Sequence, residues 1–330
     1  MKNKLLYVVL GIISIVIVYL LIAPRAESFY AYIPNADEGT ISVIDTKKDE
    51  LVKTIKVDDV LSDGIEVSRD GALIYVGNYE KGQLLIVDAK SGEIVEKIAT
   101  GKNLHGIDMT PDGKFLYLAS GDFKEGEQYN YITVLDTTTN KITNEILTTS
   151  KSPSHIDFSR DGSLAYVANI LSNDITLIDT KTQKIIATIP VGTIPNEVEP
   201  SSDDKYLFVA NVTDGTVSIV DIVAQKEIDI IKAGEGTHGI AISPDGNYIY
   251  ASNRASNDVV MIDMETKEVV NSIETGIVAN HVSYVPDLNK LYVTNKDSND
   301  LAVIDAENLT MIKKVSLGKT PHEISFAPSY

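Results

Sequence analysis

The five histidines of this chain lie at related positions of an internal repeat. They are His105, His155, His238, His281 and His322. When the repeats are aligned, His105, His238 and His322 share one column, and His155 and His281 share the next. Neutral imidazole is a common metal ligand and a common general base. The pattern therefore predicts one shared polar site.

The same two columns hold the other candidate ligands. Besides Ser154 and Asn280, the first column contains Asp63 and Asn196, and the second contains Glu197 and Glu323. Repeats also duplicate residues that have no role, and such histidines would only satisfy backbone groups or water. Both interpretations stay open at this point.

The repeat itself is read from a recurring Tyr-x-x-Asn-like tetrapeptide. Its seven copies begin 43, 42, 49, 42, 42 and 42 residues apart, at Tyr32, Tyr75, Tyr117, Tyr166, Phe208, Tyr250 and Tyr292. An apolar run ending in aspartate follows each copy, and a Pro-Asp-Gly-like turn precedes most of them. A period of 40–45 residues with four short strands is typical of a propeller blade. We therefore predict an all-β, seven-bladed β-propeller with four antiparallel strands per blade.

The two ends of the repeat region fit a closed ring. The first unit lacks its first strand, and residues 322–327 supply a spare copy of that strand. Blade 1 is therefore expected to combine both ends of the chain, because closure removes exposed sheet edges.

Residues 292–295 read Tyr-Val-Thr-Asn, the motif that names the YVTN repeat. From residue 28 to 330 the chain resembles this family of exported seven-bladed propellers. A more distant similarity of repeat type links it to the haem-d1 propellers. The resemblance implies the fold but little about function.

In a propeller, the first strand of each blade lines the central channel. The histidine columns begin these strands, so they are expected at the channel mouth where the loops between blades emerge. Alternation along a regular strand points the two columns in opposite directions. Hence only one column should face the axis, and neither set should form a compact cluster. We therefore expect a wide ligand or a partner segment here, and changing His105, His238 and His322 to Ala should abolish its binding.

The other motifs in the sequence are weaker indicators of function. Residues 234–239 match G-x-G-x-x-G but lie between strands with no helix to follow, which disfavours a dinucleotide site. The aspartates that end the seven apolar runs recur once per blade, as structural turn residues do. Residues 121–131 lengthen one loop of blade 3 on the histidine face, either as a binding feature or as a tolerated insertion.

The first residues form a separate segment. Residues 5–23 contain no charge and would rise about 28 Å as a helix, close to the thickness of the hydrocarbon core. Lys2 and Lys4 precede them, which favours export of the rest of the chain. We expect residues 1–27 to be an uncleaved single-pass membrane anchor and residues 28–330 to face outside the cytoplasm. A cleaved signal peptide and a cytoplasmic propeller are the alternatives.

Charge and cysteine content exclude several classes of function. Residues 1–27 carry +2, so the total of −18 leaves −20 on the propeller, which disfavours nucleic acid. An acidic surface can attract cations or a basic partner. The chain has no cysteine, which excludes disulfides and cysteine catalysis.

No catalytic motif is present, so a binding or scaffold module acting through the channel mouth is the first functional hypothesis. The alternative is a cofactor-handling protein that uses the histidines to hold a tetrapyrrole or a metal, although the sequence requires neither. A lyase with His238 or Glu197 as general base is a third possibility.

Overall fold

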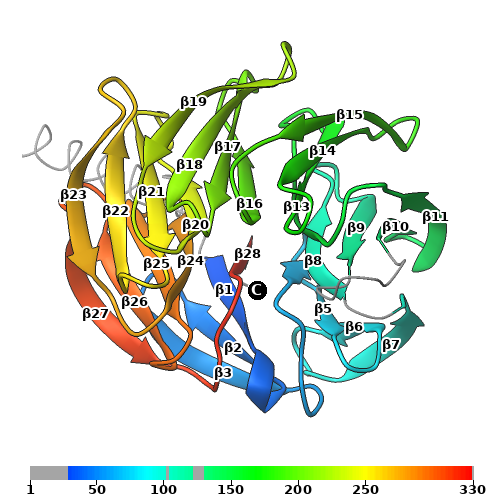
Figure 1. The fold of residues 1–330 in the computed structure, drawn as a ribbon. Coiled ribbons are helices and arrows are strands. Elements are labelled where there is room, and N and C mark those ends of the chain that lie inside the picture. Colours follow the sequence, from blue (N-terminus) through cyan, green and yellow to red (C-terminus); the bar gives the residue numbers. More distant parts are fainter. Residues whose placement is uncertain (1–28, 102–103, 122–129, 329–330) are drawn as a thin grey trace, which may run out of the picture.

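The computed structural model describes residues 29–101, 104–121 and 130–328, and these form seven four-stranded sheets around a central axis (Figure 1). The innermost strands are β28 (Ser325–Pro328), β4 (Ile65–Val67), β8 (Leu104–Met109), β12 (Pro153–Phe158), β16 (Pro195–Pro200), β20 (Thr237–Ile242) and β24 (Ala279–Val285). The second strands are β1 (Phe29–Asn35), β5 (Leu73–Asn78), β9 (Phe115–Ser120), β13 (Leu164–Asn169), β17 (Tyr206–Asn211), β21 (Tyr248–Asn253) and β25 (Lys290–Asn295).

The third strands are β2 (Thr40–Asp45), β6 (Gln83–Asp88), β10 (Tyr131–Asp136), β14 (Asp174–Asp179), β18 (Thr216–Asp221), β22 (Asp258–Asp263) and β26 (Asp300–Asp305). The outer strands are β3 (Glu50–Lys56), β7 (Ile94–Ala99), β11 (Lys141–Leu147), β15 (Lys184–Pro190), β19 (Lys226–Lys232), β23 (Glu268–Glu274) and β27 (Thr310–Ser316). One 3₁₀ turn, η1 (Ala36–Glu38), follows β1. The predicted seven blades of four antiparallel strands are confirmed.

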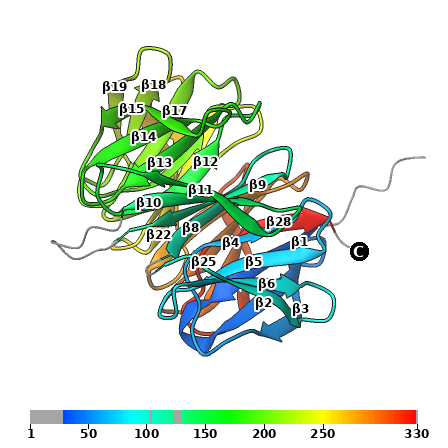
Figure 2. The same cartoon turned by 90° about the vertical axis from the view of Figure 1, so that its right-hand side faces the viewer.

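Blade 1 joins the two ends of the described chain, as predicted. Strand β28 pairs with β1, with Phe29 opposite Pro328 and Tyr32 opposite Ser325, and the two lie side by side in Figure 2. The strand is shorter than expected, because only the bridge between Asn35 and Pro321 continues the pairing. The four strands of blade 1 follow the order β28-β1-β2-β3.

The apolar core lies between blades. Each of the seven apolar clusters combines side chains from two neighbouring blades, as when Tyr32 and Ile41 of blade 1 pack with Ile74 and Leu85 of blade 2. These four side chains are at most 1% exposed. At about 25 cal/mol per Å² of buried apolar surface, such contacts supply most of the stabilisation that holds the ring closed.

The asparagine of the repeated tetrapeptide fastens the second strand to the third. Asn211 is fully buried and donates from Nδ2 to Thr216 Oγ1 at 3.1 Å and Ser218 Oγ at 2.7 Å. A Cβ on Gly192 would lie 2.5 Å from Asn211 Cγ, and Gly234, Gly276 and Gly318 lie similarly close to the equivalent asparagines, which explains the glycine at these four blade junctions. Gly234 has the same relation to Asn253, so the G-x-G-x-x-G match is a packing feature.

The seven aspartates at the ends of the third strands cap turns, as predicted. Asp263 Oδ1, for example, accepts hydrogen bonds from the backbone N–H of Glu265 at 2.9 Å and Thr266 at 2.8 Å. Equivalent bonds are made by the other six, Asp45, Asp88, Asp136, Asp179, Asp221 and Asp305.

Two expectations concern residues outside the described ranges. The predicted anchor at residues 1–27 lies there, and so do residues 122–129 of the long loop in blade 3. Within the described ranges, no helix is long and apolar enough to cross a membrane.

We expect Asp49 to be a strong stabilising contact between blades 7 and 1. Its carboxylate is 5% exposed and accepts from Lys290 Nζ at 2.6 Å and Tyr292 Oη at 2.7 Å. Asp49→Ala leaves the buried Tyr292 hydroxyl and the half-buried Lys290 ammonium without this acceptor, which typically costs about 3–5 kcal/mol. Tyr292→Phe removes one bond and should cost about 1 kcal/mol. Urea unfolding of both variants measures the difference, and equal losses would contradict the assignment.

Candidate functional site

The five histidines meet at one end of the channel. The His155 and His281 ring centroids are 5.0 Å apart, and His281 lies 4.7 Å from His238 and 5.2 Å from His322. His105 lies 5.0 Å from His155. The expectation that neither column forms a compact cluster is therefore wrong.

A β-bulge at the start of the innermost strands explains this outcome. In blade 4, Pro153 pairs with Asn169 and Ile156 with Val167, so Ser154 and His155 together oppose one residue of β13. Similar register shifts occur at the start of β8, β16, β20 and β24. A bulge breaks the alternation of side chains, so both histidine columns reach the same site.

Glycines in the second column bring the blades close together. A Cβ on Gly106 would lie 2.1 Å from the Ser154 carbonyl oxygen, and one on Gly239 would lie 2.9 Å from His281 Cα. The backbone of the next blade occupies the space that any side chain would need. The channel is therefore narrow where the imidazoles meet.

Three acidic side chains contact four of the imidazoles. His281 Nδ1 lies 2.9 Å from Glu197 Oε2, and His155 Nδ1 contacts Glu323 Oε1. Asp63 sits between two rings, 3.2 Å from the Nε2 atoms of both His105 and His322.

The fifth ring, His238, has Asn196 Nδ2 at 3.4 Å from its Nδ1. Every residue of the predicted site is thus part of one cluster.

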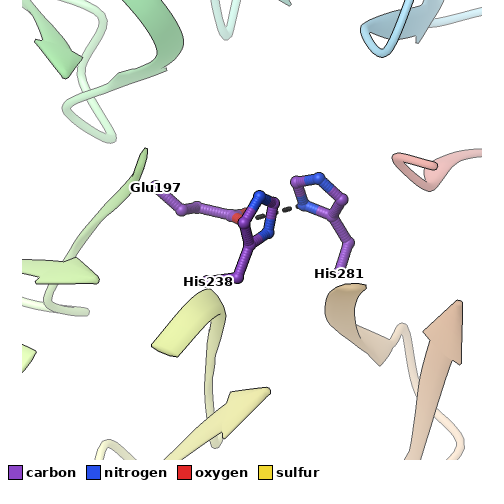
Figure 3. A group of neighbouring side chains, drawn as sticks. All are labelled: Glu197, His238 and His281. Carbon is purple, nitrogen blue, oxygen red and sulfur yellow. Dashed lines mark hydrogen bonds and ion pairs between the residues drawn. The ribbon is translucent and has the colours of Figure 1, made fainter. Parts of the chain in front are cut away.

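Several imidazole nitrogens in this cluster are buried without a hydrogen-bond partner within the described ranges, among them His155 Nε2, His281 Nε2 and His322 Nδ1. His155 and His281 are 4% and 2% exposed, and their Nε2 atoms form no hydrogen bond within the described part of the chain. Ligand atoms of Glu197, His238 and His281 lie within 4.8 Å of one another. Figure 3 shows these three side chains, from β16, β20 and β24, pointing toward one another.

Burial keeps the cluster largely uncharged at its centre. It lowers the pKa of His281 to about 4, and it lowers the pKa of His238 and His322 well below the usual histidine range. Burial also raises the pKa of Glu197 to about 8. The imidazoles of His238, His281 and His322 are therefore neutral at pH 7 and have lone pairs available for an electrophile.

Sequence reasoning missed a second layer of acidic groups deeper in the channel. Glu66, Asp108, Asp157 and Glu199 line a cavity of about 310 Å³ together with His155 and His281. Each lies two residues after the position that belongs to the second histidine column in its blade. This i, i+2 relation was the available signal, because alternate residues of a strand share a face.

We expect this acidic layer to make the protein more stable at pH 5 than at pH 8. Burial raises the pKa of Glu66 to about 7, and burial with nearby Asp157 and Glu66 raises that of Asp108 well above its ordinary value. Unfolded carboxyl groups titrate near about 4, so the folded state binds protons more tightly. Their stabilising protonation is complete below about pH 4 and is lost as pH rises through about 7.

The measurement is the melting temperature against pH in buffer containing a chelator. Between pH 5 and 8, wild type should lose at least about 2–4 °C more than a variant without these carboxyl groups, equivalent to about 1 kcal/mol, because the buried histidines contribute with the opposite sign. Glu66→Gln with Asp108→Asn should flatten the curve, whereas Glu265→Gln on an exposed turn should not. An unchanged curve in the double variant would contradict the prediction.

Comparisons with known proteins place this fold among propellers. The Cytochrome D1 heme domain model matches residues 22–110. Hydrazine synthase of Kuenenia stuttgartiensis is 22% identical, with a TM-score of 0.74 over 84% of this chain and 92% of that chain. A functionally unknown protein from Desulfotomaculum acetoxidans has a TM-score of 0.75 at 16% identity, over 91% of this chain and 99% of that chain.

The dihydro-heme d1 dehydrogenase NirN, solved in complex with DHE, has a TM-score of 0.65 at 15% identity, over 89% of this chain and 74% of that chain. At these identities the likeness shows the fold alone. The search of curated proteins gives no match. The YNCE-like beta-propeller model matches residues 109–328, two thirds of the sequence and five of the seven blades. The chain therefore belongs to the YNCE-like β-propeller family.

Proposed function

We propose that this protein is a metal-binding propeller that holds a divalent transition-metal ion among His155, His238 and His281, with Glu197 beside them. The observation that carries the proposal is the pair of buried, unpartnered Nε2 atoms on His155 and His281. Leaving a buried polar atom unpaired costs about 1–3 kcal/mol, and a bound cation would remove that cost. Imidazole ligands suit zinc, copper, iron and nickel.

The arrangement around the two rings supports a metal. Glu197 and Glu323 contact the Nδ1 atoms of His281 and His155, which leaves each Nε2 to face the ion. Carboxylates commonly orient metal-binding histidines in this way and raise their basicity, and a bound cation would favour the ionised form of Glu197, whose pKa burial raises to about 8.

The spacing of the rings also suits one ion. Two imidazoles on one tetrahedral zinc have ring centroids about 5 Å apart, given a Zn–N bond of about 2 Å. The pairs His155–His281 and His238–His281, at 5.0 and 4.7 Å, match this value, whereas His155 and His238 are farther apart, at 6.4 Å.

Titration of chelator-treated wild-type protein with Co²⁺ tests the proposal, because tetrahedral Co²⁺ has intense visible bands. We expect one ion per chain and competition by Zn²⁺. A protein that binds no Co²⁺ in the visible titration and no Zn²⁺ by calorimetry would refute the proposal.

A tetrapyrrole is the second candidate, favoured by the match of the Cytochrome D1 heme domain to a segment that includes Asp63 and His105. The central rings fit it poorly, because His238, His281 and His322 are each only 2% exposed. His105, with 12% of its side chain exposed, borders a separate cavity of about 400 Å³ and is the imidazole best placed to reach a macrocycle. The absorption spectrum of natively purified protein separates the candidates.

We also propose that the propeller is anchored by residues 1–27 and lies outside the cytoplasm with the histidine face pointing away from the membrane. Phe29 lies opposite Pro328, at the end of the channel remote from the histidines. The linker of residues 24–28 reaches only about 17 Å when extended. The chain lacks cysteine, so labels at Asn247→Cys and Glu235→Cys would report depth uniquely. A label at Glu235→Cys that lies as deep as the other would refute this orientation.

A further inference from the structure

Among the described residues, two basic side chains at the channel mouth form no ion pair with a carboxylate. The residue after each repeated tetrapeptide begins a loop at the mouth, and the seven are Ala36, Tyr79, Gly121, Ile170, Val212, Arg254 and Lys296. The only charged members, Arg254 and Lys296, belong to adjacent blades and are half-buried. Within the described ranges neither forms an ion pair, whereas the nearby carboxylates of Asp63 and Glu197 bind imidazoles.

The Arg254 guanidinium is held in place by a single neutral contact. Its Nε donates to Asn280 Oδ1 at 2.6 Å, and Asn280 is fully buried in the first histidine column. This bond fixes the orientation of the amide, so Asn280 Nδ2 is a true donor, and it has no acceptor among the described residues. The remaining guanidinium N–H groups form no hydrogen bond there either. Such a group of donors without acceptors suits an anion.

Both cations act on the metal-binding cluster itself. Burial lowers the pKa of His322, and the positive charges of Arg254 and Lys296 contribute to lowering it further. Lys296 also borders the 400 Å³ cavity that contains His105 and Asp63. Besides burial, Arg254 also contributes to lowering the pKa of His238 and His281, so its charge lies near the central rings, whereas Lys296 lies near His322 and Asp63. Asp63, Asp297 and Glu197 lie close enough to oppose the lowering of the Arg254 pKa by burial, but none of them forms an ion pair with it within the described ranges, so its N–H donors stay available to a small anion.

We propose that the channel mouth binds a small organic carboxylate together with the metal, one carboxylate oxygen coordinating the ion and the rest of the anion contacting Arg254 and Lys296. Asn280 is the positioning residue for Arg254. This inference rests on the proposed metal site and names its ligand class. Arg suits the task because its planar donors match a carboxylate in a bidentate geometry, and Lys adds a point charge.

Oxalate is the test probe, because its two carboxylates can bridge a metal and a guanidinium. Protein loaded with one equivalent of Co²⁺ and freed of excess metal is titrated with oxalate, and filtration checks that the Co²⁺ stays bound. We expect a saturable change in the visible bands. Arg254→Gln and Lys296→Gln should each weaken oxalate about 10- to 100-fold, the usual loss for a charge-assisted hydrogen bond. Their Co²⁺ affinity should stay equal or increase.

The controls separate recognition from general charge. Lys205→Gln removes the same charge from an exposed turn and should leave oxalate binding unchanged. Arg254→Lys keeps the positive charge but loses the planar pair of N–H donors, so this variant should bind oxalate with intermediate affinity. If both Gln variants bind oxalate like wild type, or oxalate leaves the wild-type spectrum unchanged, the anion site is refuted while the metal site stands. If no Co²⁺ binds, the metal site fails, and calorimetry of oxalate with metal-free wild type and Arg254→Gln decides the anion site separately.

Discussion

Deleting residues 322–330 is expected to abolish cooperative unfolding of the propeller. The deletion removes β28, which pairs with β1 and closes blade 1. It also removes Phe326 and Ile324 from the apolar cluster between blades 7 and 1, and Ala327 from the cluster between blades 1 and 2. The ring would lose one of its interfaces and expose a sheet edge. Calorimetry and size-exclusion chromatography of the truncated chain measure the result.

A peptide of residues 320–328 provides the matched control. Added to the truncated chain, it should restore β-strand pairing with β1 and part of the thermal transition, as strand addition does elsewhere. The same peptide with Phe326→Asp should fail, because Phe326 packs against the Tyr292 ring at a centroid distance of 6.2 Å. A truncated chain that unfolds with the wild-type transition would contradict the composite blade.

Replacing His155 and His281 together by Ala is expected to weaken Co²⁺ binding by at least about 100-fold. Both rings would supply Nε2 to the ion, and loss of even an outer-shell partner usually costs about 10- to 100-fold. His105→Ala is the matched control, because its Nε2 contacts Asp63 instead. It should change the affinity by less than about threefold, and isothermal calorimetry gives both values.

A second variant keeps this prediction testable if the double substitution destabilises the narrow channel. Glu323→Gln leaves every imidazole in place but weakens the contact with His155 Nδ1. It should reduce Co²⁺ affinity about 10- to 100-fold with little change in unfolding. If neither variant alters the affinity, the histidines are structural or the metal binds elsewhere.

The sequence by itself determined the seven-bladed ring and which residues lie at the mouth of its channel. The spacing of Tyr292 and its six equivalents fixed the number of blades, because each blade must repeat the same inter-blade packing. The missing first strand and the copy near Phe326 fixed the closure, since an unpaired edge is unfavourable. The nine residues predicted from the alignment, from Asp63 to Glu323, lie in one cluster, because equivalent positions in a repeat occupy equivalent places in space.

Only the tertiary structure decided how those residues meet. The bulge at His155 depends on hydrogen bonds to the neighbouring strand, and no periodicity in the sequence reveals it. The approach of blades at Gly106 and Gly239 depends on ring closure. Glu197 and His281 are 84 positions apart in the sequence. Several acidic side chains could contact this imidazole, and only the folded channel determines which one lies within contact distance.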